Sequence, residues 1–237
     1  RIMTDRSNSN WHVDAPLVIA HRGASLQAPE NTLAAFQKAV ELKADAIEMD
    51  VKLTADRHVV IHHDVTLDRT TDGKGRVSQL TLSEIKKLDA GSKFSIRYKD
   101  ERIPTIDEVI EEIGDRLLYN IELTNYTSPF DKLPEIVINI IRKFGIQSKI
   151  LISSFNPFAL LKVKKLEPDI MIGLLLKSSE PGWIRNLFMR IVKHDAVHPD
   201  CGLINDRYIV ESLQSQNLVN VWPVNAVEKV KKVRDLG

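Results

Sequence analysis

Short apolar runs alternate with amphipathic stretches along most of this chain, and this alternation constrains the fold more than any other feature. Apolar runs of strand length begin near residues 17, 46, 117, 149, 170, 195 and 219. Helical patterns follow them at 32–42, 105–113, 134–144, 157–166, 183–193, 206–216 and 226–235. Such alternation is typical of a parallel sheet covered by helices, so we expect an α/β fold.

Two segments interrupt the alternation. The polar turn 54–57 is too short for a helical crossover, so the run 59–61 is expected to pair back, as a hairpin, with the strand that begins at 46. Residues 64–103 carry turn signals and charges around one short predicted helix, 82–88, and we interpret them as an inserted subdomain. The rest of 12–237 is expected to form one domain after a polar tail, 1–11.

Residues with catalytic chemistry come directly after the first apolar run. The run 17–20 leads into His21 and Arg22, and the next helix has Asn31 as its expected N-cap. Open α/β folds and barrels place their chemistry at the carboxyl ends of strands. A histidine can move a proton near neutral pH, and the arginine fork fits a phosphate group.

Carboxylates mark the following strands. Glu48 and Asp50 are two residues apart, so they point to the same face of their strand. They repel each other unless a cation lies between them or one is protonated, although a solvated edge strand would also explain this pair. Glu122 lies near the end of the run 117–123 and adds a third oxygen ligand. Oxygen ligands suit Ca²⁺, Mg²⁺ or Mn²⁺, and the single cysteine, Cys201, argues against zinc.

A histidine pair ends the hairpin strand 59–61. His62 and His63 point opposite ways if the backbone is extended, so at most one of them is expected to reach the carboxylates.

These features belong to a longer series of motifs that closely resembles the glycerophosphodiester phosphodiesterases. The series covers nearly the whole chain in the expected order, and the ordered conjunction is specific. The motifs are His21-Arg22-Gly23, Pro29-Glu30-Asn31-Thr32, Ala35-Phe36, Ile47-Glu48-Met49-Asp50-Val51 with Thr54, His63-Asp64, Leu67-Asp68-Arg69-Thr70-Thr71, Ile103-Pro104-Thr105-Ile106, Ile121-Glu122-Leu123, Ser154-Phe155 and Val221-Trp222-Pro223-Val224-Asn225.

The resemblance implies a catalytic TIM (β/α)8-type barrel of the phosphatidylinositol-phospholipase C-like kind. It further implies an acid/base pair, substrate-binding residues and a site for one divalent cation, Ca²⁺ or Mg²⁺, with Mn²⁺ also compatible. By motif, the acid/base residues are His21 and His63, the substrate-binding residues are Arg22, Thr124 and Trp222, and the metal ligands are Glu48, Asp50 and Glu122. For Trp222, a purely barrel-lining role is an equal alternative.

One position departs from the family pattern. The family commonly has a lysine two residues after the third carboxylate, where this chain has Thr124. A hydroxyl replaces a positive charge there, which could change the substrate, weaken phosphate binding, or be compensated by another cation such as Arg69.

The activity implied is hydrolysis of glycerophosphodiesters to glycerol 3-phosphate and an alcohol such as choline or ethanolamine. Within the same class, a lysophospholipase D acting on lipid-bearing diesters is an alternative, with 182–189 as a possible apolar lip. A catalytically silent barrel that binds phosphodiesters is an alternative of a different class.

Length and charge agree with a barrel enzyme that acts on a small molecule. The 237 residues are close to the roughly 250 of a typical TIM barrel. Seven parallel strands are predicted where a barrel needs eight, so the last strand is expected to be missing from this chain. The net charge of +1 gives no sign of a nucleic-acid partner, and no apolar stretch is long enough to cross a membrane. One cysteine favours a reducing, cytoplasmic setting, with secretion after removal of a leader as the alternative.

Overall fold

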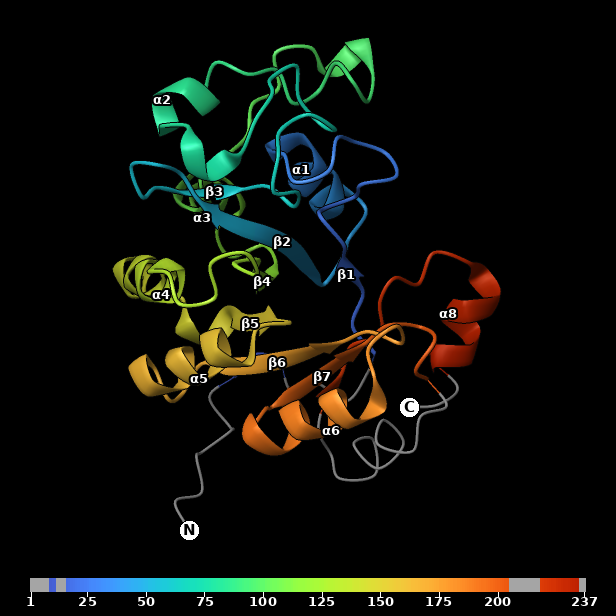
Figure 1. The fold of residues 1–237 in the computed structure, drawn as a ribbon. Coiled ribbons are helices and arrows are strands. Elements are labelled where there is room, and N and C mark those ends of the chain that lie inside the picture. Colours follow the sequence, from blue (N-terminus) through green and yellow to red (C-terminus); the bar gives the residue numbers. More distant parts are fainter. Residues whose placement is uncertain (1–8, 12–15, 205–217, 235–237) are drawn as a thin grey trace.

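A parallel sheet forms the centre of the computed structural model, which describes residues 9–11, 16–204 and 218–234. Seven strands pair in parallel, and within the described ranges their spatial order is their chain order, as in a TIM barrel. The predicted fold class and seven parallel strands are therefore confirmed (Figure 1). The strands are β1 (Ile19–Ala20), β2 (Ala46–Leu53), β4 (Leu118–Leu123), β5 (Ile150–Ser154), β6 (Met171–Leu176), β7 (Ala196–Pro199) and β8 (Leu218–Val219).

Helices follow most of these strands, and all but the last of them pack along the outside of the sheet (Figure 1). They are α1 (Leu33–Glu41), α3 (Ile106–Ile113), α4 (Leu133–Phe144), α5 (Pro157–Leu166), α6 (Gly182–Ile191) and α8 (Val227–Arg234). The predicted helix 206–216 lies outside the described residues. Within the part of the chain that the structure describes, no helix is long and apolar enough to span a membrane.

The hairpin prediction is confirmed. β3 (Val59–Ile61) runs antiparallel to β2, with Val51 opposite Ile61. The turn between the strands includes Arg57 in the left-handed region, at a φ of 63°. Since β3 pairs with the end of β2, the residues that follow it return towards the end of β2, and His62 donates its N–H to the Asp50 carbonyl over 2.9 Å.

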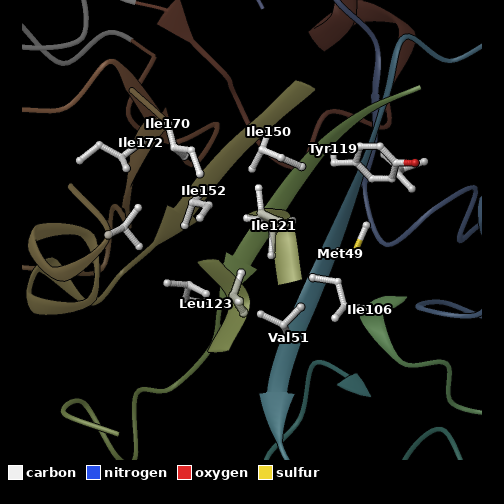
Figure 2. Close-up of a cluster of buried hydrophobic side chains, with 14 of the residues drawn as sticks. Met49, Val51, Ile106, Tyr119, Ile121, Leu123, Ile150, Ile152, Ile170 and Ile172 are labelled. Carbon is white, nitrogen blue, oxygen red and sulfur yellow. The ribbon is translucent and has the colours of Figure 1, made fainter. Parts of the chain in front are cut away.

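Residues of odd and even number face opposite sides of β2 and β4. The odd-numbered residues from Ile47 to Val51 and from Tyr119 to Leu123 are buried in the main hydrophobic cluster between the sheet and the helices, and Leu53 packs against it. Figure 2 shows this cluster with Met49, Val51, Ile121 and Leu123 near Ile106 of α3. The even-numbered residues of the same strands therefore face the barrel interior, where the polar side chains gather.

Apolar side chains close the interior of the barrel at the amino ends of the strands. Trp11 is the last residue of the predicted polar tail. Its side chain is 1% exposed and packs with Ala46, Leu151 and Met171. Its indole N–H donates to the carbonyl of Lys149 over 3.0 Å. This packing leaves the opposite end of the barrel for polar groups.

Residues 64–103, interpreted from the sequence as an inserted subdomain, form two 3-10 helices and the short α2 (Leu82–Ile85). Their buried side chains make a second hydrophobic cluster that includes Leu67, Ile85 and Val60 of β3. Figure 1 shows α2 beside β3, at the end of the molecule away from α5 and α6.

Candidate functional site

Three carboxylates converge at the carboxyl ends of β2 and β4. In parallel register, Asp50 is the Cα partner of Glu122, and Glu48 lies two residues earlier on the same face. One carboxylate oxygen from each of the three lies within 4.8 Å of the others. Glu48 and Asp50 are 5% and 1% exposed, so water solvates little of this negative charge.

The electrostatics of this cluster fit a cation. Burial, together with repulsion from Asp50 and then Glu122, raises the pKa of Glu48 well above its usual range. Burial and repulsion from Asp50 raise the pKa of Glu122 to about 8. The Oε1 atom of Glu48 is buried and has no hydrogen-bond partner. Three converging carboxylates with an unpartnered oxygen match the ligands of a hard divalent cation.

Arg22 joins the loop after β1 to this cluster. Its backbone N–H donates to Glu48 Oε2 over 2.7 Å, and its Nε lies 3.3 Å from Asp50 Oδ2. Its Nη1 donates to Glu30 over 2.9 Å. Arg22 has a φ of 56°, so the chain turns sharply there and directs both its amide and its side chain at the carboxylates.

His21 lies beside the same carboxylates. Its Nε2 is 4.0 Å from Glu48 Oε2, and its side chain is 41% exposed. Burial of the imidazole and the charge of Arg22 lower the pKa of His21, with repulsion from His63 contributing in the same direction. His63 follows the residue whose N–H bonds to the Asp50 carbonyl, so it also lies beside the end of β2.

His62 and His63 occupy different environments, as their alternation in the sequence predicts. His63 is half-exposed, and its Nδ1 lies 2.6 Å from Asp64 Oδ1. His62 is 4% exposed, and its Nε2 lies 3.0 Å from the carbonyl oxygen of Thr66. Burial lowers the pKa of His62 and favours its neutral form.

Glu30 and Asp64 hold the two arginine side chains near the carboxylate cluster. Arg69 pairs with Glu30 and with Asp64, in both cases at 2.6 Å. Although burial opposes it, hydrogen bonds and charge from Arg69 and Arg22 lower the pKa of Glu30 to about 2. Arg69, which the sequence suggested as a replacement for the family lysine, is therefore occupied by these carboxylates.

A row of aromatic side chains connects Glu122 to Trp222. The Tyr126 hydroxyl donates to Glu122 Oε1. The ring of Phe155 stands edge-on to Tyr126, at 5.6 Å between centroids, and to Trp222, at 5.7 Å. The indole N–H of Trp222 donates to the carbonyl of His198 over 2.8 Å. Trp222 thus reaches the carboxylates through two intervening aromatic rings.

Comparison with known proteins assigns the family. The glycerophosphoryl diester phosphodiesterase family matches residues 21–237. This chain belongs to that family.

Similar proteins in this family include bacterial relatives. A glycerophosphodiester phosphodiesterase of Caldanaerobacter subterraneus is 52% identical over 160 residues, an alignment that covers 67% of this chain and 66% of the relative. A glycerophosphodiester phosphodiesterase of Bacillus subtilis is 32% identical and aligns with 94% of this chain and 82% of its own. The solved structure of an Oleispira antarctica phosphodiesterase, in complex with the product sn-glycerol-3-phosphate, superposes with a TM-score of 0.85 at 34% identity, over 94% of this chain and 90% of the other.

The structure places seven of the eight site residues predicted from the family motifs close together. The carboxylates, Arg22, His21 and His63 lie at one end of the barrel, and Thr124 comes directly after the last residue of β4. The eighth, Trp222, touches this end only through Phe155 and Tyr126.

Sequence reasoning missed two residues that contact the carboxylates: Tyr126, which donates to Glu122, and Asn31. Asn31, expected to cap α1, has a φ of 58° and bonds to Asp50 instead, whereas the N-cap of α1 is Thr32. The motif Pro29-Glu30-Asn31-Thr32 contains a signal for this role. Thr32 can cap the helix by itself, which leaves the Asn31 amide for another contact.

Proposed function

We propose that this chain hydrolyses glycerophosphodiesters to glycerol 3-phosphate and an alcohol. The observation that carries the proposal is the convergence of Glu48, Asp50 and Glu122 beside His21 and Arg22, in a chain of the phosphodiesterase family. The bound product in the Oleispira antarctica relative adds support, since sn-glycerol-3-phosphate is the product expected here.

The three carboxylates are the proposed ligands of one divalent cation, with Ca²⁺, Mg²⁺ and Mn²⁺ as candidates. Such an ion, when bound, supplies positive charge that polarises a phosphoryl oxygen. Arg22 supplies a second, permanent charge. Its side chain is held by Glu30 and Asp50, so its position beside the site does not depend on the substrate.

The two histidines are the proposed acid/base pair. One accepts the proton of the attacking hydroxyl, and the other donates a proton to the leaving alcohol. For the nucleophile we propose the 2-hydroxyl of the substrate's own glycerol, which gives a cyclic phosphate that water then opens. An ionised Asp64 accepts a hydrogen bond from His63 Nδ1, which leaves Nε2 of that ring to exchange a proton with the substrate.

The test is turnover of glycerophosphocholine by the full chain with Ca²⁺, Mg²⁺ or Mn²⁺, followed by ³¹P NMR of the products. We expect glycerol 3-phosphate to appear, chelation with EDTA to stop its formation, and Glu48→Gln to abolish most of it. Turnover of lysophosphatidylcholine alone would overturn this assignment in favour of a lysophospholipase D. Binding of glycerophosphocholine without turnover would instead indicate a silent barrel.

A further inference from the structure

A lysine stands on the same face of β2 as two of the carboxylates. Lys52 comes two residues after Asp50, so both side chains face the barrel interior. Its Nζ donates to two atoms of Thr124, the residue that follows the neighbouring strand β4: the carbonyl over 3.0 Å and the hydroxyl over 2.8 Å.

Thr124 is itself held in place, so it can fix the position of the Lys52 ammonium. Its side chain is 4% exposed, and its hydroxyl donates to the carbonyl of Val51 over 2.8 Å. Since the hydroxyl proton is used there, the oxygen can only accept from Lys52. In the β2–β4 register Asp50 pairs with Glu122, so Lys52 and Thr124 both lie two residues further along, Lys52 within β2 and Thr124 just past the end of β4.

Within the part of the chain that the structure describes, no carboxylate lies within ion-pair distance of the Lys52 ammonium. Among the ion pairs within 4.0 Å in the described ranges, none includes Lys52, whereas Arg22 and Arg69 both pair with Glu30. An ammonium has three N–H donors, and Thr124 accepts from two of them. One donor of a held positive charge is therefore available next to the carboxylate cluster.

We propose that Lys52 contacts the phosphate group of the substrate and that Thr124 is the residue that positions it. The positive charge that Thr124 cannot carry is delivered from the neighbouring strand, and the threonine hydroxyl and carbonyl hold it in place. This inference rests on the proposed function in so far as the ligand is a phosphate ester. A lysine acts on such a group as a point charge, so its contribution depends on where the ammonium is held.

The first experiment substitutes Lys52→Met, which keeps most of the stem and removes the charge. Binding of glycerol 3-phosphate at a saturating divalent cation is measured by calorimetry, and KM and kcat with glycerophosphocholine. We expect the Kd of glycerol 3-phosphate to rise roughly 10- to 100-fold, as for loss of a hydrogen bond to a charged group. We expect KM to rise and the affinity for the divalent cation to stay within about threefold. Lys38→Met, on the outer face of α1, is the matched control and should leave both affinities unchanged.

The second experiment separates positioning from a structural role of Thr124. Thr124→Val removes the hydroxyl while keeping the shape, and Thr124→Ser keeps the hydroxyl. We expect Thr124→Val to weaken glycerol 3-phosphate binding less than Lys52→Met does, because the Thr124 carbonyl still holds the ammonium. We expect Thr124→Ser to restore wild-type binding. Combining Thr124→Val with Lys52→Met should add little to the effect of Lys52→Met alone.

The outcomes distinguish this inference from the function on which it rests. If the wild type turns over glycerophosphocholine while Lys52→Met binds glycerol 3-phosphate as the wild type does, Lys52 is not a phosphate ligand and the inference falls alone. A folded Lys52→Met that loses cation affinity but not glycerol 3-phosphate affinity would also overturn it. If the wild type binds glycerol 3-phosphate through Lys52 but turns over no diester, the inference stands and the proposed function fails.

Discussion

Asn31 and Asp50 are joined by two hydrogen bonds, which make the loop before α1 part of the candidate metal site. Asn31 Nδ2 donates to Asp50 Oδ2 over 2.8 Å, and the Asp50 N–H donates to Asn31 Oδ1 over 3.3 Å. The φ of 58° at Asn31 turns its side chain back towards β2, a conformation that asparagine adopts more readily than most residues. The amide therefore orients a carboxylate that is itself buried.

The first prediction concerns this orientation. Asn31→Gly removes the amide and accepts the positive φ without strain. We expect affinity for the divalent cation to fall roughly 10- to 100-fold, the usual effect of losing a residue that orients a metal ligand. Titration calorimetry with Ca²⁺ and Mg²⁺ measures it, and Asn10→Gly, at an exposed position, is the control. Unchanged cation affinity would show that the Asp50 carboxylate is held without the amide.

The second prediction separates the adjacent histidines. His63→Asn is expected to lower kcat by ~10²–10⁴ because it removes an acid/base group, with little effect on thermal stability. His62→Asn is expected to lower the melting temperature with a much smaller effect on kcat, because His62 is buried and bonded near Thr66. Steady-state kinetics and thermal melts of both variants measure this contrast. A larger loss of kcat in His62→Asn would mean that the hairpin delivers the other ring to the substrate.

The sequence predicts the strands and the carboxylates well because both depend on short-range patterns. Apolar runs bounded by turns mark β2 and β4, and the period of two alone places Glu48 and Asp50 on one face. The outward-facing residues, such as Met49 and Ile121, follow from the same period (Figure 2). The family motifs then supply the order of the strands.

Contacts between elements could not be predicted in the same way. Asn31 has a sequence position that suits a helix cap, and only the turn after β1 directs it to Asp50. Lys52 is an ordinary polar residue of a strand until the β2–β4 register sets it beside Thr124. The segment 64–103 has no repeating sequence pattern, because its helices are short and pack around a small cluster of their own.

The third prediction is a pH dependence of stability that originates at His198. This residue is 2% exposed, and its Nε2 lies 3.0 Å from Asn220 Nδ2. Burial lowers the pKa of His198 to about 3, whereas an unfolded histidine titrates near 6.5. The unfolded state therefore binds the extra proton, so stability is complete above pH 6.5 and falls as the pH drops from there towards 3.

Between pH 7 and pH 5 this group alone is expected to cost about 2 kcal/mol of unfolding free energy. Urea unfolding at both pH values measures the loss, and His198→Gln, which does not titrate, is expected to show a smaller one. An equal pH dependence in the wild type and His198→Gln would mean that His198 is protonated in the folded state.

The fourth prediction tests whether the phosphate site has room for only one lysine ammonium, either from Lys52 or from position 124. Thr124→Lys restores the family residue, yet it removes the hydroxyl that bonds Lys52 and sets a second ammonium beside the first. Like charges at this distance repel, so Thr124→Lys is expected to bind glycerol 3-phosphate no more tightly than the wild type, and to lose stability. In a Lys52→Met background the repulsion is absent, and the new lysine is expected to recover most of the lost affinity.

Calorimetry with glycerol 3-phosphate on the two single variants and the double variant measures this, with thermal melts to confirm folding. Tighter binding by Thr124→Lys alone would contradict the prediction, because it would mean that the phosphate can use a lysine at position 124 while Lys52 remains in place.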